Sequence, residues 1–175
     1  MKSTGEVMGI GETFGEAFAK GWIAANQRLP LSGTAFLTVH DRDKRALVPV
    51  ALRLQQLGFR LVATDGTAEH LRGQGVPVET VLKLHQGRPH VVDHIKNGDV
   101  DLIVNTPLGG DAYREDAEIR RAALAHRVPC ITTLSGAMAA ADGIAALRKG
   151  ALSLVPLQCL ATADATSAIP AATTE

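Results

Sequence analysis

Residues 59–68 read FRLVATDGTA and join a short apolar run to an Asp-Gly pair flanked by two threonines. The apolar part has the length and residue types of a buried strand, and the AEHLRGQG that follows it has those of a short helix. We therefore expect one strand–turn–helix unit with TDGT at the turn. Repetition of this unit along the chain would predict a sheet of parallel strands covered by helices.

The unit recurs over most of the chain. The expected strands are 34–40, 59–64, 76–84, 100–106 and 128–133, with a sixth candidate at 151–157. The expected helices that follow the five strands are 41–58, 68–75, 88–98, 113–126 and 134–150. The run LIV at 102–104 shows no polar alternation, as expected for a strand buried on both faces. The predicted fold class is α/β, with three αβα layers around a mostly parallel, five-stranded, Rossmann-like sheet.

Two of these helices carry specific expectations. Pro49 lies within the first, and we place it in an early turn because proline is costly in a helix interior. Asp41 or Asp43 is expected to cap the start of the same helix. In the helix at 113–126, His126 falls on the apolar side.

The two ends of the chain differ from its middle. A helix is expected at 12–26, where aromatic and small apolar residues recur at helical spacing. The predicted organisation is a helical connector at 1–33, an α/β domain at 34–157 and a flexible tail at 158–175, because the tail offers small and polar residues without a core face.

Composition excludes several classes of function. The chain has 175 residues, 46% of them hydrophobic, which suits one domain with a substantial core. Its formal net charge is zero and only 3% of residues are aromatic, so neither nucleic acid nor an anionic membrane is an expected partner. Cys130 and Cys159 show no metal or redox spacing and are expected to be structural thiols in a cytoplasmic protein. The six histidines show no paired spacing, so no metal site is expected.

Candidate ligand-binding residues follow the strands, because ligands bind at the carboxyl ends of open parallel sheets. They are Thr38 and Lys44 after the first strand, Thr64, Gly66 and Thr67 after the second, Lys83 after the third, Asn105 and Thr106 after the fourth, and Thr132 after the fifth. Hydroxyls, lysines and helix starts suit phosphate oxygens, and the Asn105 amide suits a base or sugar edge. The set contains no concentrated carboxylate pair, and Asp65 is expected to face solvent. Taken singly, each residue also fits an ordinary cap or a solvated surface position.

Several segments together resemble a known family. GEVMGIGETFGEAFAKG, FLTVHDRDKR, GFRLVATDGTA, VLKLHQGRPHVVDHIKNG, VNTPLGG, IRRAAL and TTLSGAMAAA occur in this order. They resemble the carboxyl-terminal allosteric domain of the carbamoyl phosphate synthetase large subunit, which has the methylglyoxal-synthase-like fold. The resemblance covers residues 2–157, and its first segment resembles the end of the preceding catalytic half.

This resemblance implies a regulatory part of a ligase used in pyrimidine and arginine biosynthesis. In the family, two ATP-grasp halves make carbamoyl phosphate with ATP, Mg²⁺ or Mn²⁺, and K⁺, while a small subunit hydrolyses glutamine. Because this chain contains neither ATP-grasp half, the resemblance implies a fragment without catalytic residues or a cofactor of its own. Its expected partners are the rest of the large subunit and the small subunit, and the formation of homo-oligomers stays open.

The resemblance also assigns ligands to the strand-end residues. It implies that uridine monophosphate (UMP) or inosine monophosphate (IMP) binds here as effector. The phosphate would contact Thr38, Lys44, Thr64, Gly66, Thr67 and Lys83, and the ribose or base would contact Asn105 and Thr106. Thr132 matches a threonine of the family's ornithine site. Pro107 and Cys130 stand where the family often has a hydroxyl and a tyrosine, so the effector and the ornithine response stay open.

Three other functions are alternatives to this one. Methylglyoxal synthase uses a catalytic aspartate as general base, whereas Arg88 lies near that position here. Inosinate cyclohydrolase has a lysine-rich loop that VLKLHQGRP resembles only in part. The last alternative is an interaction module with a vestigial pocket.

Overall fold

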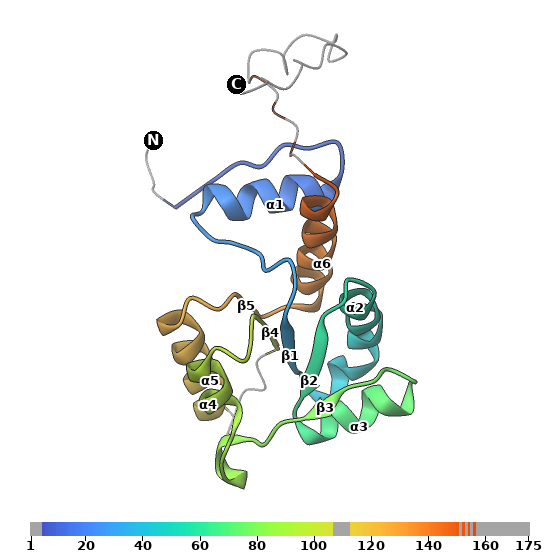
Figure 1. Cartoon of the computed structure of the whole chain (residues 1–175), viewed down its shortest axis with the longest axis vertical. Coiled ribbons are helices and arrows are strands. Elements are labelled where there is room, and N and C mark those ends of the chain that lie inside the picture. The colour runs from blue at the N-terminus through green and yellow to red at the C-terminus, as the bar shows by residue number, and fades with distance from the viewer. Residues whose placement is uncertain (1–4, 107–112, 151, 153, 155, 157–175) are drawn as a thin grey trace.

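The computed structural model describes residues 5–106 and 113–150 together with positions 152, 154 and 156. A single five-stranded sheet in the order β3-β2-β1-β4-β5 lies at its centre, and every adjacent pair of strands is parallel (Figure 1). The strands are β1 (Thr34–Thr38), β2 (Arg60–Ala63), β3 (Glu79–Thr80), β4 (Leu102–Asn105) and β5 (Cys130–Ile131). The five predicted strands are therefore confirmed, and the sheet is parallel throughout.

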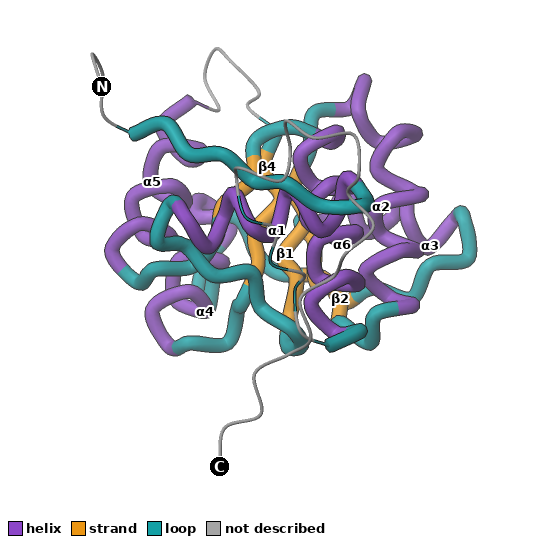
Figure 2. The backbone as a smooth tube through the Cα atoms, turned by 90° about the horizontal axis from the view of Figure 1, so that it is seen from above, coloured by secondary structure: helices purple, strands orange, loops and turns teal. Residues whose placement is uncertain are grey.

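Helices cover both faces of this sheet. They are α1 (Phe14–Ala24), α2 (Lys44–Gln56), α3 (Asp65–Gly73), α4 (Val91–Asn97), α5 (Tyr113–Ala125) and α6 (Leu134–Arg148), with 3-10 turns at Asp41–Asp43 and Leu84–Gln86. α2, α3 and α6 share one core cluster with the sheet, and α4 and α5 share the other. The tube view shows these two helical layers on either side of the strands (Figure 2). The predicted three-layer αβα architecture is confirmed.

The central strand explains why both layers are needed. In β1, Phe36 packs into the cluster beneath α4 and α5, whereas Leu37 packs into the cluster beneath α2 and α6, and both are fully buried. Successive strand side chains point to opposite faces, so a strand covered on both sides has no exposed position that favours a polar residue. Burial of such a side chain stabilises the fold by about 1.5–3 kcal/mol.

α1 lies outside these layers, against α6 (Figure 1). Thr13 caps α1, since its hydroxyl accepts the backbone N–H of Glu16. Gly15 lies so close to α6 that a Cβ atom there would stand 2.6 Å from the Asp142 carbonyl oxygen. Phe18 and Trp22 add partly buried aromatic surface to the same contact. The expected helix at 12–26 is thus confirmed, and small residues allow its close packing.

Several local expectations were wrong. α3 begins at Asp65 rather than at residue 68, because Thr64 takes the extended N-cap conformation and TDGT enters the helix instead of forming a separate turn. Pro49 is the sixth residue of α2, beyond its first turn, and lies on the exposed side, where water can solvate the carbonyl that lost its donor. Asp43 occupies the N-cap position of α2 without a side-chain capping bond. His126 is exposed, because α5 ends before it.

The candidate strand at 151–157 falls mostly outside the described residues, and the tail at 158–175 and Cys159 lie wholly outside them. None of the helices in the described ranges has both the length and the apolar character that crossing a bilayer requires.

Candidate functional site

The candidate site lies at the point where successive strands stop being added on one side of β1 and start being added on the other. β1 pairs with β2 on one side and with β4 on the other, so the strand order switches between β1 and β4. Ligands in doubly wound sheets bind at the carboxyl ends of the strands at this point. Thr38 ends β1, Asn105 ends β4 opposite Thr38, and Thr64 follows β2. The topology alone therefore brings together three of the predicted residues.

Four threonines form a hydrogen-bonded cluster at this edge. The hydroxyl oxygens of Thr38 and Thr64 lie 3.2 Å apart, and the Thr64 hydroxyl donates to that of Thr67 over 3.5 Å. The Thr106 hydroxyl accepts the backbone N–H of His40 at 3.0 Å, and its own backbone N–H donates to the Thr38 carbonyl at 3.2 Å. All four threonines are at most 7% exposed. They are inner parts of the edge, not solvated surface positions.

Thr64 has an unusual role for an N-cap residue. A threonine in this position normally accepts a backbone N–H from the first turn of its helix. The Thr64 side chain makes no such bond to α3 and contacts Thr38 instead. The Thr67 N–H donates to the Thr64 carbonyl at 2.9 Å, but no described side chain accepts the N–H groups of Asp65 and Gly66. The positive end of the helix dipole adds to their attraction for an anion. Asp65 is exposed, as predicted.

Asn105 is the most unusual polar group of the edge. It is 1% exposed, and neither its Oδ1 nor its Nδ2 has a hydrogen-bond partner within the described part of the chain. A buried polar atom without a partner costs about 1–3 kcal/mol of folding free energy, so native structures rarely keep one without a functional reason. The amide offers both a donor and an acceptor to a molecule entering the site.

Two lysines flank the threonines. Lys83 lines a cavity of about 40 Å³ together with Thr38 and Thr64. The Lys44 Nζ lies 3.2 Å from the point where a Cβ on Gly66 would stand, so this ammonium covers the first turn of α3. Absence of a side chain at Gly66 thus lets a cation approach the same helix start.

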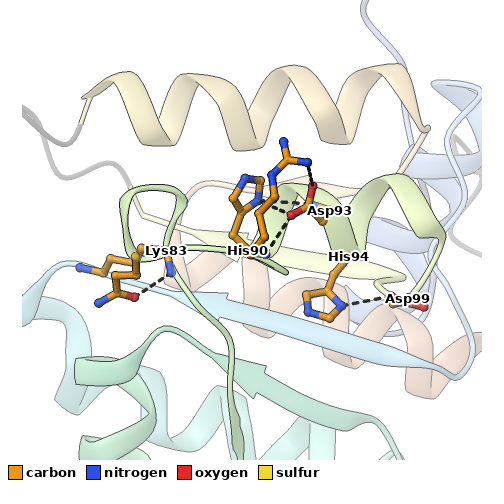
Figure 3. Close-up of polar contacts among 7 residues, drawn as sticks. Lys83, His90, Asp93, His94 and Asp99 are labelled. Atoms are coloured by element: carbon orange, nitrogen blue, oxygen red, sulfur yellow. Dashed lines mark hydrogen bonds and ion pairs between the residues drawn. The ribbon is translucent and has the colours of Figure 1, made fainter.

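The loop that carries Lys83 is fixed at both ends (Figure 3). The Lys83 backbone N–H donates to the Gln86 side chain at 2.8 Å. At the far end, the Asp93 carboxylate accepts the His90 N–H at 3.1 Å while the His90 ring accepts the Asp93 N–H at 3.4 Å. This bond from the His90 backbone, with a smaller contribution from the charge of Arg88, lowers the pKa of Asp93. The short α4 therefore starts at a defined place, and the loop before it has little freedom.

Two carboxylates of the cavity were missed. Glu115 and Asp116, in the first turn of α5, line it beside Lys83, and Asp116 is 3% exposed. The His85 Nδ1 lies 2.5 Å from a Glu115 oxygen and ties the Lys83 loop to α5. The predicted set contains neither carboxylate because its members directly follow strands, whereas Glu115 and Asp116 lie in a helix. An acidic pair at the first helix turn after β4 was the available signal.

The other predicted residues lie apart from this cluster. Thr132 is exposed after the edge strand β5, and no hydrogen bond joins it to the threonines among the described residues. Burial beneath α5 raises the pKa of Cys130 to about 11, which keeps the thiol protonated and unreactive at neutral pH. Across the described ranges no three His, Cys, Asp or Glu side chains are arranged to hold a metal ion.

The fold and this edge define a doubly wound α/β domain with a polar switch point. The family model that matches residues 46–132 is described as the MGS-like domain. The chain belongs to this family, and its sequence relatives are large chains of carbamoyl phosphate synthase.

Three relatives show the extent of this similarity. The chain is 51% identical to the carbamoyl phosphate synthase large chain of Acidobacterium capsulatum over 91% of its own length and 15% of that protein. It is 54% identical to the carboxyl-terminal section of this large chain from Methanopyrus kandleri, over 82% of the chain and 27% of the relative. For the arginine-specific chloroplastic large chain of Arabidopsis thaliana the values are 48%, 90% and 13%. The chain therefore spans roughly a quarter or less of the length of these relatives.

A solved methylglyoxal synthase from Elizabethkingia anophelis shares the fold, with a TM-score of 0.50 and 21% sequence identity over 63% of this chain and 76% of that one. Sequence identity at this level indicates a shared fold and nothing about a shared function. The methylglyoxal-synthase-like architecture is thus confirmed.

Proposed function

We propose that this chain is an effector-binding regulatory domain that takes a nucleoside monophosphate such as UMP or IMP at the carboxyl edge of its sheet. In the whole enzyme, it would tune the ATP-dependent synthesis of carbamoyl phosphate that a glutaminase small subunit supplies with ammonia. The similarity to carbamoyl phosphate synthase large chains over most of this chain supports this role. No catalytic residue or cofactor of its own is assigned to it.

The unpaired amide of Asn105 is the observation that carries the proposal. Folding buries this group without a partner among the described residues, although a leucine, which has a similar branched shape, would avoid the cost at the end of β4. A base or sugar edge with one donor and one acceptor would satisfy both atoms at once. Binding would then recover free energy that folding leaves unused.

The threonines and lysines beside Asn105 suit the phosphate of the same ligand. Hydroxyls of Thr38 and Thr67, the start of α3 and the ammonium groups of Lys44 and Lys83 supply donors and positive charge. A phosphate dianion accepts several such bonds, and charge-assisted bonds are roughly twice as strong as neutral ones. The nucleoside would extend from this phosphate towards Asn105 and Thr106.

The proposed regulation is a population shift. An effector can move a conformational equilibrium only by its difference in affinity for the two states, and such couplings are typically ~1–3 kcal/mol. The segment 2–33 would connect this domain to the catalytic part of a longer chain, since α1 lies in it and packs on α6. Thr132, which is exposed, would belong to a second effector site only together with residues from outside this chain.

One observation favours an enzymatic alternative. Glu115 and Asp116 place carboxylates beside the proposed phosphate pocket, and a carboxylate beside a bound substrate is one of the groups that act as a general base. Conversion of dihydroxyacetone phosphate to methylglyoxal tests this directly, and turnover by the chain would replace the regulatory proposal.

Thermal unfolding with phosphate, UMP and IMP tests the proposed function. A ligand present at ~100 times its Kd stabilises the folded state by about 2.7 kcal/mol, which is easily measured. We expect stabilisation by at least one nucleotide, and by inorganic phosphate at higher concentration. A folded chain that none of these ligands stabilises would contradict the proposal and favour an interaction module with a vestigial pocket.

A further inference from the structure

Lys44 has a carboxylate neighbour that the proposed phosphate site does not explain. Asp41, in the 3-10 turn before α2, holds its Oδ1 2.7 Å from the Lys44 Nζ. Within the described part of the chain, this is the one carboxylate in ion-pairing distance of Lys44. The same ammonium covers the first turn of α3 at Gly66, where the phosphate is proposed to bind.

The two members of this pair differ in their access to water. The Asp41 side chain is 87% exposed, whereas that of Lys44 is 20% exposed. The lysine is therefore held in place by the surrounding structure, while the carboxylate can rotate into solvent without breaking any packing. An exposed ion pair of this kind contributes little to stability, so breaking it costs little.

The electrostatic surroundings of Asp41 come from the same site. The hydrogen bond from Lys44, and then its charge, lower the pKa of Asp41, with smaller contributions from His40 and Lys83. Both lysines of the phosphate site thus act on this carboxylate, which stays ionised at neutral pH. The Asp41 carboxylate therefore already interacts with the two positive charges that a bound phosphate would contact.

We propose that Asp41 is an internal counter-ion of the phosphate site, which occupies Lys44 in the empty state and must leave it when a phosphate binds. This inference rests on the proposed function. Asp41 lowers the affinity for an anion, because an incoming anion has to displace a negative charge that the chain itself supplies. A dianion adds net charge in that exchange, whereas a monoanion only replaces one like itself, so Asp41 favours phosphate monoesters over simple carboxylates.

The test is the affinity of the 175-residue chain for inorganic phosphate, measured by calorimetry at pH 8 in low salt. Asp41→Asn removes the competing charge, and we expect phosphate to bind about two- to fivefold more tightly, in keeping with the usual strength of an exposed pair. The gain should shrink as salt is raised, since added ions screen the pair. A merely structural role of Asp41 would not produce this salt dependence.

Asp43→Asn is the matched control. It removes an equal charge from the same turn, but the Asp43 carboxylate faces Arg42, at 3.7 Å, and makes no cap bond to α2. Phosphate affinity should change less in this variant than in Asp41→Asn. Equal affinities in the two variants, with a wild type that binds phosphate, would overturn the role of Asp41 alone. If no variant binds phosphate while all unfold at the wild-type denaturant concentration, the proposed function fails and this inference with it.

Discussion

A cavity lies at each end of the parallel strands, at the amino edge where the strands begin and at the carboxyl edge where they end. The two cavities differ in volume and in how many of the polar groups around them already have partners. At the amino edge, a cavity of about 520 Å³ is bordered by charged groups that already have partners. Arg60 Nε donates to Glu79 at 2.8 Å, and Asp101 accepts the Thr34 N–H at 2.7 Å. Figure 3 shows the contact of His94 with Asp99 in this region. The carboxyl edge has a cavity of only about 40 Å³, yet it contains the unpaired amide of Asn105 and an uncapped helix start.

Because of this difference, we place the proposed ligand site by its unsatisfied polar groups and not by cavity volume. A large polar opening whose charges pair with each other gains little from a ligand, because the ligand has to replace bonds that exist already. An edge with an unpaired donor and acceptor gains bonds that the described residues do not make among themselves. The comparison is sharpened by variants that act on one edge only.

The largest effect is expected for loss of charge at the carboxyl edge. Lys83→Ala should weaken phosphate binding by about tenfold or more, and Thr67→Val by several-fold, because they remove a charged and a neutral donor respectively. Calorimetric titration with phosphate measures both. Arg60→Ala, which removes a cation from the amino edge, is the control and should leave phosphate affinity unchanged. Full affinity in both Lys83→Ala and Thr67→Val would refute the assigned phosphate site.

A second variant tests whether the amino edge is structural. Asp101→Ala should lower the free energy of unfolding by about 1–3 kcal/mol, because the Thr34 N–H at the start of β1 loses a charged acceptor. Urea unfolding measures this. Asp99→Ala, at a carboxylate that is 52% exposed, serves as comparison and should cost less. If both variants lost the same free energy of unfolding, the bond from Thr34 to Asp101 would contribute no more than an exposed ion pair.

The third variant should have the opposite sign. Asn105→Leu removes a buried amide that has no partner among the described residues, so we expect it to raise the free energy of unfolding by about 1 kcal/mol while nucleotide binding is lost. Denaturation and titration of the same preparation give both values. A destabilised variant would show that Asn105 serves the fold, and the contrast between the two edges would disappear.

The smallest effect concerns the exposed Arg60–Glu79 pair. The hydrogen bond from Arg60 lowers the pKa of Glu79 below its ordinary value of 4.5. The pair therefore stabilises the fold above pH 4.5, and this contribution is lost as the pH falls through the lowered pKa. Glu79→Gln should therefore unfold slightly more easily than wild type at pH 7, and the difference should shrink as the pH is lowered to 3. Unfolding curves at the two pH values measure this. A difference that persists in acid would exclude the ion pair as its cause.

Much of the fold was predictable because burial leaves a direct trace in the sequence. β1 and β4 are apolar at every inner position, since helices cover both of their faces. The end of α4 was equally clear, as Gly98 takes the left-handed conformation that glycine tolerates best. The start of α3 was predicted too late, because an Asp-Gly pair is as common in turns as in first helical turns.

The site was predictable as far as strand order determines it. Thr38, Thr64 and Asn105 follow from the rule that strand ends meet at one edge. Glu115 and Asp116 do not, since their approach depends on the packing of α5 against α4 and the sheet. The sequence also does not reveal that Asn105 lacks a hydrogen-bond partner among the described residues, because this depends on every group that surrounds the amide.

α6 has a mechanical consequence beyond its share of the core. It starts directly after β5 at the carboxyl edge and ends at Arg148, whose side chain donates to the Leu31 carbonyl near α1. Fifteen residues make it a rod roughly 22 Å long. At Gly15 and Gly143 its backbone lies in direct contact with that of α1, and the rings of Phe18 and Trp22 pack beside this crossing. We therefore expect a displacement of α6 at the strand ends to displace α1 as well.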